Sequence, residues 1–276
     1  MCFIPNDKMA LTHSITQKLQ SLVQRQQCFS NQQNLKDLSK DDYAQYMNIR
    51  TACFHLIRIP HKHFHTGPDT FAAAINILDV FLWKVKVTVR HISIVSVACY
   101  YIALKILENG ENHPSAKELS SRYEWTANDL CRMELNILQK LGWYAPTVSY
   151  GDFLSIFAEV YGININHLHC DEVTVLAQKC LSLQPTVLMQ PAVLALSLLH
   201  HIKSEMRTSP LRPQVVVHCN IQETQLRFCQ ENVVSVAALS QISATRFQLK
   251  MHKRKYDKPS EIGTTCLSTI IEEPSA

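Results

Sequence analysis

The sequence has few turn-forming residues and no common catalytic motif. Its 276 residues include only 6 glycines, which argues against an all-β protein, because such folds need many turns. It contains no glycine-rich phosphate loop, no Gly-x-Ser-x-Gly and no His-Glu-x-x-His, so no standard motif indicates an active site. An enzyme is therefore the least favoured class. We expect no catalytic residue, no cofactor and no small-molecule substrate.

Metal-binding and disulfide patterns are also missing. The ten cysteines include no Cys-x-x-Cys pair, and the histidines at 61–65 and 167–169 do not have the spacing of a zinc site. Several cysteines fall inside helical patterns, where free cysteine behaves as a small apolar residue. The first 20 residues carry charges instead of an apolar signal run. We therefore expect no metal, and a reducing location in the nucleus and cytoplasm.

Neither the net charge nor the apolar runs indicate nucleic acid or membrane as a partner. The net charge is only +4, too small to suggest nucleic-acid binding by itself. The most apolar run, 92–107, includes Ser93, Ser96 and Lys105 and falls short of the roughly 18 to 20 apolar residues of a membrane span. Because it lacks a polar face, it is expected to be a helix surrounded by other helices.

Apolar residues recur at helical spacing along most of the chain. One helix is predicted near the N-terminus, followed by a polar linker. A first set of five helices is predicted at about 42–57, 68–82, 89–107, 115–123 and 126–141, with Pro60 ending the first of them. A second set is predicted at about 148–161, 171–183, 191–204 and 222–239.

These elements predict an all-α protein with a duplicated architecture, since the third helix of each set is the most apolar. The predicted parts are an N-terminal helix with linker, two successive helical bundles and a C-terminal tail, at 1–41, 42–145, 146–249 and 250–276. The tail lacks periodicity, and we expect it to be disordered. Its basic cluster, 250–258, is either a nuclear address or a solvated tail.

Two charges lie where the helical pattern predicts apolar surroundings. Arg50 falls in the middle of the apolar stripe of the first helix, and Asp79 lies at the edge of the stripe on the second. A charge turned inward is costly unless it is paired. We therefore predict an Arg50–Asp79 ion pair that fixes how these two helices meet.

Two further charges allow two interpretations. Lys105 ends the apolar third helix, and Glu134 lies on the inner face of the fifth. They form either another internal salt bridge or a surface feature that awaits the backbone groups of a partner. Lysine donates up to three hydrogen bonds and glutamate accepts several, so both interpretations remain open.

The segments that carry these four charges resemble the cyclin box. They are Asn48–Ala52, Asn76–Leu82, Tyr101–Lys105 and Arg132–Glu134. The box pattern has Arg in its first helix, Asp before Arg-Phe-Leu in the second, Lys closing the third and Arg-Met-Glu in the fifth. Here the four charges are 29, 26 and 29 residues apart, which needs no gaps. Residues 146–245 resemble a second, more diverged cyclin fold, and 150–157 is similar to the cyclin G and I group.

The resemblance implies two successive five-helix cyclin-fold bundles and a regulatory role in cell-cycle control. The implied partner is a cyclin-dependent-type serine/threonine kinase. In cyclins, the residues matching Lys105 and Glu134 contact the kinase's regulatory helix and the start of its activation segment, so that the kinase's own Lys–Glu pair forms. The residues matching Arg50 and Asp79 brace the box. The alternative is a cyclin-fold transcription or adaptor scaffold that does not activate a kinase.

The chain departs from the cyclin pattern at a patch on the first helix. Many cell-cycle cyclins dock substrate peptides there with Met, Ile, Leu and Trp, beside an acidic residue. The matching positions here are Ile49, Ala52, Cys53 and Leu56. Ile59 replaces the acid, and Val80 replaces the Arg of Asp-Arg-Phe-Leu. We expect this degenerate patch to bind Arg-x-Leu peptides poorly.

Overall fold

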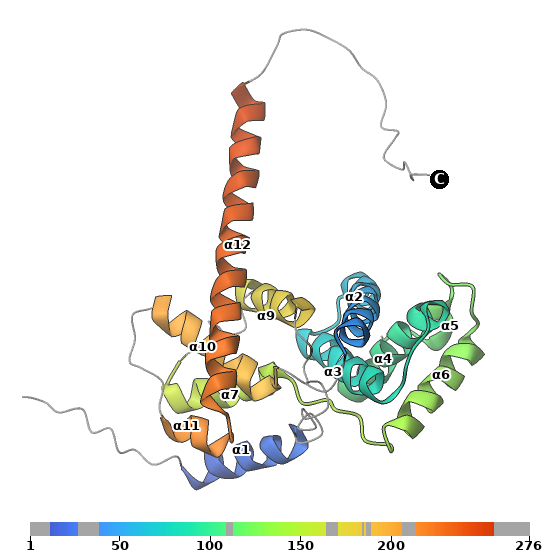
Figure 1. The fold of residues 1–276 in the computed structure, drawn as a ribbon, viewed down its shortest axis with the longest axis horizontal. Coiled ribbons are helices and arrows are strands. Elements are labelled where there is room, and N and C mark those ends of the chain that lie inside the picture. The colour runs from blue at the N-terminus through green and yellow to red at the C-terminus, as the bar shows by residue number, and fades with distance from the viewer. Residues whose placement is uncertain are drawn as a thin grey trace, which may run out of the picture. The chain divides into compact units, whose positions relative to one another are not determined.

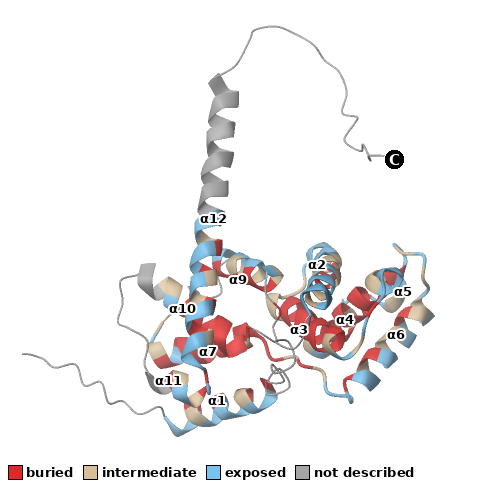
Figure 2. Cartoon of the chain, viewed as in Figure 1, coloured by how far each residue is buried: buried red, intermediate tan, exposed pale blue. Residues whose placement is uncertain are grey.

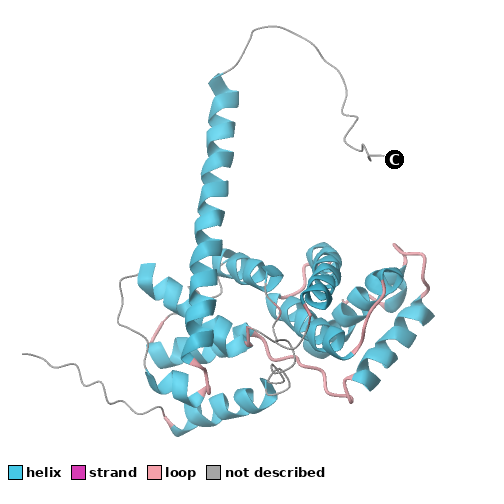
Figure 3. Ribbon diagram, in the orientation of Figure 1, coloured by secondary structure: helices cyan, strands magenta, loops and turns pink. Residues whose placement is uncertain are grey.

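The computed structural model describes residues 12–26, 39–108, 113–163, 171–183, 185, 189–205 and 213–256. Every regular element in these ranges is a helix (Figure 3). The chain is therefore all-α, as the sequence predicts. The described residues up to Val236 form one compact unit, and those from Ala237 form a second.

The first set of helices is built around one apolar helix. It comprises α2 (Lys40–His63), α3 (Pro68–Lys84), α4 (Ile92–Leu107), α5 (Ala116–Ser120) and α6 (Ala127–Lys140), with the 3-10 turn η3 (Val89–His91) ahead of α4. Helices α2, α3 and α6 all pack against α4 (Figure 1). Both α5 and α6 begin with a capping box, in which an N-cap hydroxyl and an acidic side chain three residues later satisfy each other's backbone N–H groups.

Helix α4 is a core helix, although it also has the composition of a membrane span. The segment Val89–Leu107 is long and apolar enough to cross a membrane, which corrects our expectation that this run falls short. Most of α4 between Ile94 and Leu104 is buried in this chain (Figure 2). A helix that is apolar all round is stable in water when other helices surround it, and α2, α3 and α6 do so here.

The second set also contains five described helices. They are α7 (Tyr150–Tyr161), α9 (Asp171–Leu183), α10 (Pro191–Glu205), α11 (Pro213–His218) and α12 (Glu223–Tyr256). Helix α10 packs against α7 and α9. The N-terminal helix α1 (His13–Gln26) packs against α7 and α11. The first described helix therefore lies on the second set.

The structure corrects two helix boundaries and adds one helix. Helix α2 continues through Pro60 to His63. The Pro60 carbonyl still accepts a helical hydrogen bond, from the Phe64 N–H at 2.9 Å. Helix α11 has no counterpart in the sequence prediction, since six residues are too few to show a helical period. Helix α12 extends to Tyr256, beyond the predicted end at 239 and past the start of the predicted tail. The rest of that tail, 257–276, lies outside the described residues, as does 31–38 of the predicted linker, 31–42. The end of that linker already belongs to α2, which begins at Lys40.

Helix α7 starts in close contact with α3. The Asn76 Nδ2 donates a hydrogen bond to the Val148 carbonyl at 2.7 Å, and the Ser149 hydroxyl, the N-cap of α7, donates to Asp69. Gly151 follows in the first turn, and a Cβ added there would overlap Asp69 Oδ1. Hydrogen bonding holds that oxygen in place, so this approach requires glycine.

Replacing Gly151 with alanine is therefore expected to destabilise the fold. We expect Gly151→Ala to lower the free energy of unfolding by about 1–2 kcal/mol, because overpacking outweighs the gain in helix propensity. The matched control is Gly67→Ala, whose added Cβ would lie 3.5 Å from Glu108 Oε1, an ordinary contact. Urea unfolding of both variants checks this. If Gly151→Ala and Gly67→Ala have the same free energy of unfolding, the Asp69 side chain simply moves away from the added Cβ.

Candidate protein-binding surface

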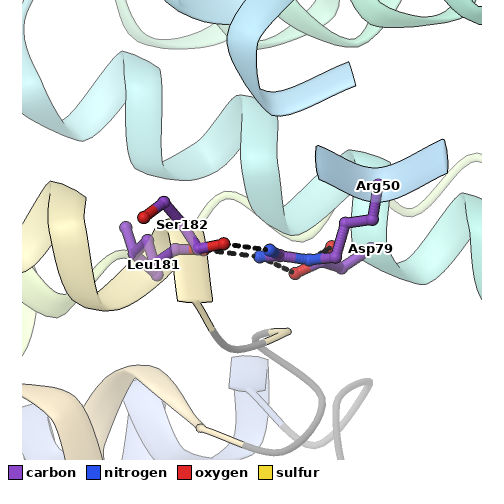
Figure 4. A network of polar contacts seen from close by, with 4 residues as sticks. All are labelled: Arg50, Asp79, Leu181 and Ser182. Atoms are coloured by element: carbon purple, nitrogen blue, oxygen red, sulfur yellow. Dashed lines mark hydrogen bonds and ion pairs between the residues drawn. The ribbon is translucent and has the colours of Figure 1, made fainter. Parts of the chain in front are cut away.

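A buried ion pair sets the position of α2 relative to α3. Arg50 Nε lies 2.7 Å from Asp79 Oδ1, and Arg50 Nη2 lies 3.1 Å from Asp79 Oδ2 (Figure 4). Neither side chain has any exposed surface. Burial alone would lower the pKa of Arg50, but the charge and hydrogen bonds of Asp79 outweigh it and raise that pKa. Two parallel N–H···O bonds make this the strongest type of side-chain pair.

The same guanidinium also holds the end of α9. Arg50 Nη2 donates to the Leu181 carbonyl at 2.7 Å, and Arg50 Nη1 donates to the Ser182 carbonyl at 3.3 Å (Figure 4). The last carbonyls of a helix lack partners within the helix and carry its partial negative charge. One side chain therefore joins the first set of helices to the second.

Lys105 and Glu134 form an ion pair between α4 and α6. The Lys105 ammonium contacts Glu134 Oε1, and the two side chains are 38% and 12% exposed. Lys105 Nζ also lies 4.7 Å from the centroid of the Tyr101 ring, a cation–π distance. The charges therefore pair with each other, with Lys105 partly exposed to solvent and Glu134 largely covered.

An exposed apolar residue follows each of the two charges in the sequence. Ile106, next to Lys105, is 48% exposed, and Leu135, next to Glu134, is 45% exposed. Cys131 is exposed on α6, one turn before Leu135. We define the α4–α6 surface as Tyr101, Lys105, Ile106, Cys131, Glu134 and Leu135. Aromatic and apolar side chains around a charge pair that a partner can cover are typical of the centre of a protein interface.

Sequence reasoning missed the apolar members of this surface. Ile106 extends the apolar run of α4, so its pattern does not mark it as exposed. Leu135 falls outside the inner face that Leu130 and Ile137 form on α6, so the helical period does place it away from the core. One feature of the sequence could have identified both residues, because each directly follows one of the charges in the cyclin pattern. Exposure itself depends on where α6 stops covering α4, which only the packing shows.

The degenerate docking patch is only partly accessible. Ile49, Ala52 and Leu56 are half-buried, but Cys53 is fully buried and its thiol lies 3.9 Å from the Ile92 carbonyl. Burial raises the pKa of the Cys53 thiol to about 11, so it stays protonated. Three small or aliphatic side chains remain to meet a peptide at these positions.

The described residues contain no cluster suited to a metal. No group of three His, Cys, Asp or Glu side chains among them could hold an ion. His61 contacts Thr66 and Gln178 instead, and burial lowers its pKa to about 4, so it is neutral at physiological pH. The second His/Cys run, 167–170, lies outside the described residues.

Comparisons with known sequences identify a domain and a group of relatives. A family model, "Cyclin, N-terminal domain", matches residues 15–145. Cyclin-G1 of Bos taurus is 33% identical over 145 residues, which cover 50% of this chain and 49% of that protein. Human cyclin-G2 is 27% identical over 203 residues, covering 70% and 59%. The chain spans about half the length of the cyclin-G1 proteins it matches.

Comparisons with solved structures support the fold. A viral cyclin from Herpesvirus saimiri superposes with a TM-score of 0.55 and 19% identity, over 69% of this chain and 86% of that one. A chain of the yeast RNA Pol II CTD kinase CTDK-1 complex gives a TM-score of 0.55 and 14% identity, over 82% and 71%. At these identities the likeness shows the fold alone, and it confirms the predicted helical cyclin-type architecture.

The buried pair predicts a large stability effect. We expect Arg50→Met to lower the free energy of unfolding by about 3–5 kcal/mol, because Asp79 is left buried without its partner. Urea unfolding measures the change. The matched control is Lys18→Met, which removes an ion pair with Glu159 whose side chains are 54% and 51% exposed. That change should cost less than about 1 kcal/mol.

A double variant separates the two roles of Arg50. Arg50→Met/Asp79→Leu buries no charge and should recover part of the loss. It should not recover all of it, since the Leu181 and Ser182 carbonyls lose their donor. Full recovery would show that the contact with α9 contributes nothing.

Proposed function

We propose that this chain, a member of the cyclin family through residues 15–145, is a non-catalytic subunit that regulates a protein kinase. Its partner is a cyclin-dependent-type serine/threonine kinase, and its role is in cell-cycle control in the nucleus and cytoplasm. The observation that carries the proposal is the Lys105–Glu134 pair, whose lysine reaches the solvent from helices that the core holds in place.

The α4–α6 surface suits recognition of backbone groups. The Lys105 ammonium has donors to spare for the carbonyls at the end of a kinase helix, and Glu134 has lone pairs for backbone N–H groups. Their mutual contact holds both side chains in place in the free chain, which lowers the entropy lost on binding. Ile106 and Leu135, the next residues along the two helices, supply exposed apolar area. A kinase helix fixed in this way is placed to complete the kinase's own Lys–Glu pair.

The descriptions of similar proteins support a kinase partner. One similar structure is described as a CTD kinase complex, and the family model is that of a cyclin. The alternative, a cyclin-fold adaptor without kinase activation, uses the same surface but produces no activity. Binding and phosphorylation must therefore be measured separately.

The first test is a kinase-panel pull-down. Wild type and Lys105→Ala/Glu134→Ala are mixed with purified cyclin-dependent kinases, and the double variant should lose affinity about tenfold or more, since a charge pair at the interface is removed. The matched control is Lys18→Ala/Glu159→Ala, which removes another exposed Lys–Glu pair, between α1 and α7. That variant should bind like wild type.

Two outcomes would change the proposal. Undiminished binding by the Lys105/Glu134 variant would mean that a kinase contacts a different surface. Binding that depends on both residues but gives no phosphorylation of a standard kinase substrate would select the adaptor role.

The altered docking patch predicts weak substrate recruitment. A labelled Arg-x-Leu peptide should bind with a Kd above about 100 µM, because the positions of Met, Ile, Leu and Trp hold smaller side chains and Cys53 is buried. Fluorescence anisotropy measures this, with a cell-cycle cyclin carrying the complete patch as positive control. Tight binding that disappears in Leu56→Ala would contradict the expectation.

A further inference from the structure

A cavity of about 470 Å³ lies between the first half of α2 and the segment that follows α3. Its size falls in the range of pockets that accept a ligand or a large side chain. Its walls are mostly apolar and aromatic and include Tyr46, Ile49, Leu82, Trp83, Val85 and Val87. Apart from Ile49, it shares no residue with the degenerate docking patch, and it shares none with the α4–α6 surface.

The cavity wall contains a polar group without a partner. The Tyr46 hydroxyl is buried and makes no hydrogen bond within the described part of the chain. Burial, and to a lesser extent the negative charge of Asp79, raises the pKa of Tyr46, so the hydroxyl keeps its proton. A buried hydroxyl left unsatisfied is costly, but this one has no surface open to the cavity. A ligand in the cavity therefore meets the aromatic ring of Tyr46, which is an apolar surface.

The rim of the cavity offers an unpaired stretch of backbone. Val85 and Thr88 have extended backbone angles, at φ −136°, ψ 124° and φ −90°, ψ 158°. The backbone N–H groups of Lys86, Val87 and Thr88 donate no hydrogen bond within the described residues. An extended segment with free backbone groups can pair with an extended peptide in the manner of an added strand.

The charges at the rim favour an acidic ligand. Lys84 and Lys86 both line the cavity mouth, against the single acid Asp42. The Lys86 side chain is 96% exposed and its ammonium lies 3.7 Å from Asp42 Oδ1, a separation too long for a strong hydrogen bond. Lys86 can therefore turn to a carboxylate of a partner at little cost.

We propose that this cavity is a docking site for an extended segment of a partner protein, in which acidic residues flank one large apolar side chain. The apolar side chain fills the space over Tyr46, the segment's backbone pairs with Lys86–Thr88, and its acidic residues meet Lys84 and Lys86. The site lies on α2 and the segment after α3, so it can be occupied while α4 and α6 bind a kinase.

A binding assay on the full chain tests this directly. The probe is a fluorescein-labelled peptide, Ser-Asp-Glu-Leu-Phe-Glu-Asp-Ser, measured by anisotropy. A charge-reversed peptide carries Lys and Arg in place of the acids, and a third peptide carries Ala-Ala in place of Leu-Phe. We expect saturable binding of the acidic apolar probe, at least about tenfold tighter than either comparison peptide.

Two variants locate the bound peptide. Lys86→Glu should weaken binding about tenfold, while Lys117→Glu, the same charge change on exposed α5, should leave it unchanged. Val85→Asp should weaken binding about tenfold or more, because it places a charge in the apolar wall that the Leu-Phe of the probe would cover. A far-ultraviolet circular dichroism spectrum and a Tm like those of the wild type show that this loss is not due to misfolding.

The remaining outcomes overturn the proposal. They are no saturable binding, equal binding of the charge-reversed peptide, and binding that neither Lys86→Glu nor Val85→Asp weakens. A further arm replaces residues 27–38 with Gly and Ser. If the probe binds only to that variant, the occupant is this chain's own preceding segment, and docking of a partner protein is refuted. None of these results depends on whether a kinase binds at Lys105 and Glu134.

Discussion

The arrangement of the helices depends on one guanidinium that is fully buried. A lone buried charge would be untenable, yet Arg50 has Asp79 on one side and the last carbonyls of α9 on the other. Removing water from such a group is affordable only if every partner is in position. The pair thus favours a single way of packing α2, α3 and the end of α9, because a shift of any of them leaves a buried charge or carbonyl unsatisfied.

This constraint matters for the α4–α6 surface because α4 packs against the helices that Arg50 and Asp79 fix. Lys105 stands at the last turn of α4, so its place is set by the contacts of α2 and α3 with that helix. Glu134 is held by α6, whose start is fixed by the Thr126–Asp129 capping box. Charged groups supported in this way by packed helices are positioned more accurately than groups on loops. A partner meets a preformed ion pair, with exposed Ile106 and Leu135 as the next residues along the two helices.

The sequence predicted most helices and the residues of the buried pair, because both follow from apolar periodicity. Helix α9 begins and ends where predicted, at 171 and 183, and Arg50 stands out as a charge inside an apolar stripe. The link from Arg50 to α9 could not be foreseen, since its acceptors are backbone carbonyls, which every residue has. Pro60 was expected to end α2, but a proline in the last turn removes only one helical hydrogen bond, so the helix continues past it. Tyr46 looked like an ordinary stripe residue, and only the packing shows that its hydroxyl lacks a partner.

The sequence predicts a boundary between the two sets of helices at 145/146, but helices on each side of it contact the other set. Helix α1 precedes the first set yet packs on α7 and α11, and α9 of the second set ends on Arg50 of the first. The family model begins at residue 15 and therefore includes most of α1. A chain cut at 145 would keep α1 without its packing partners and Arg50 without the carbonyls of α9. The surface that carries Lys105 and Glu134 lies wholly within the first set, but the packing that supports it draws on both.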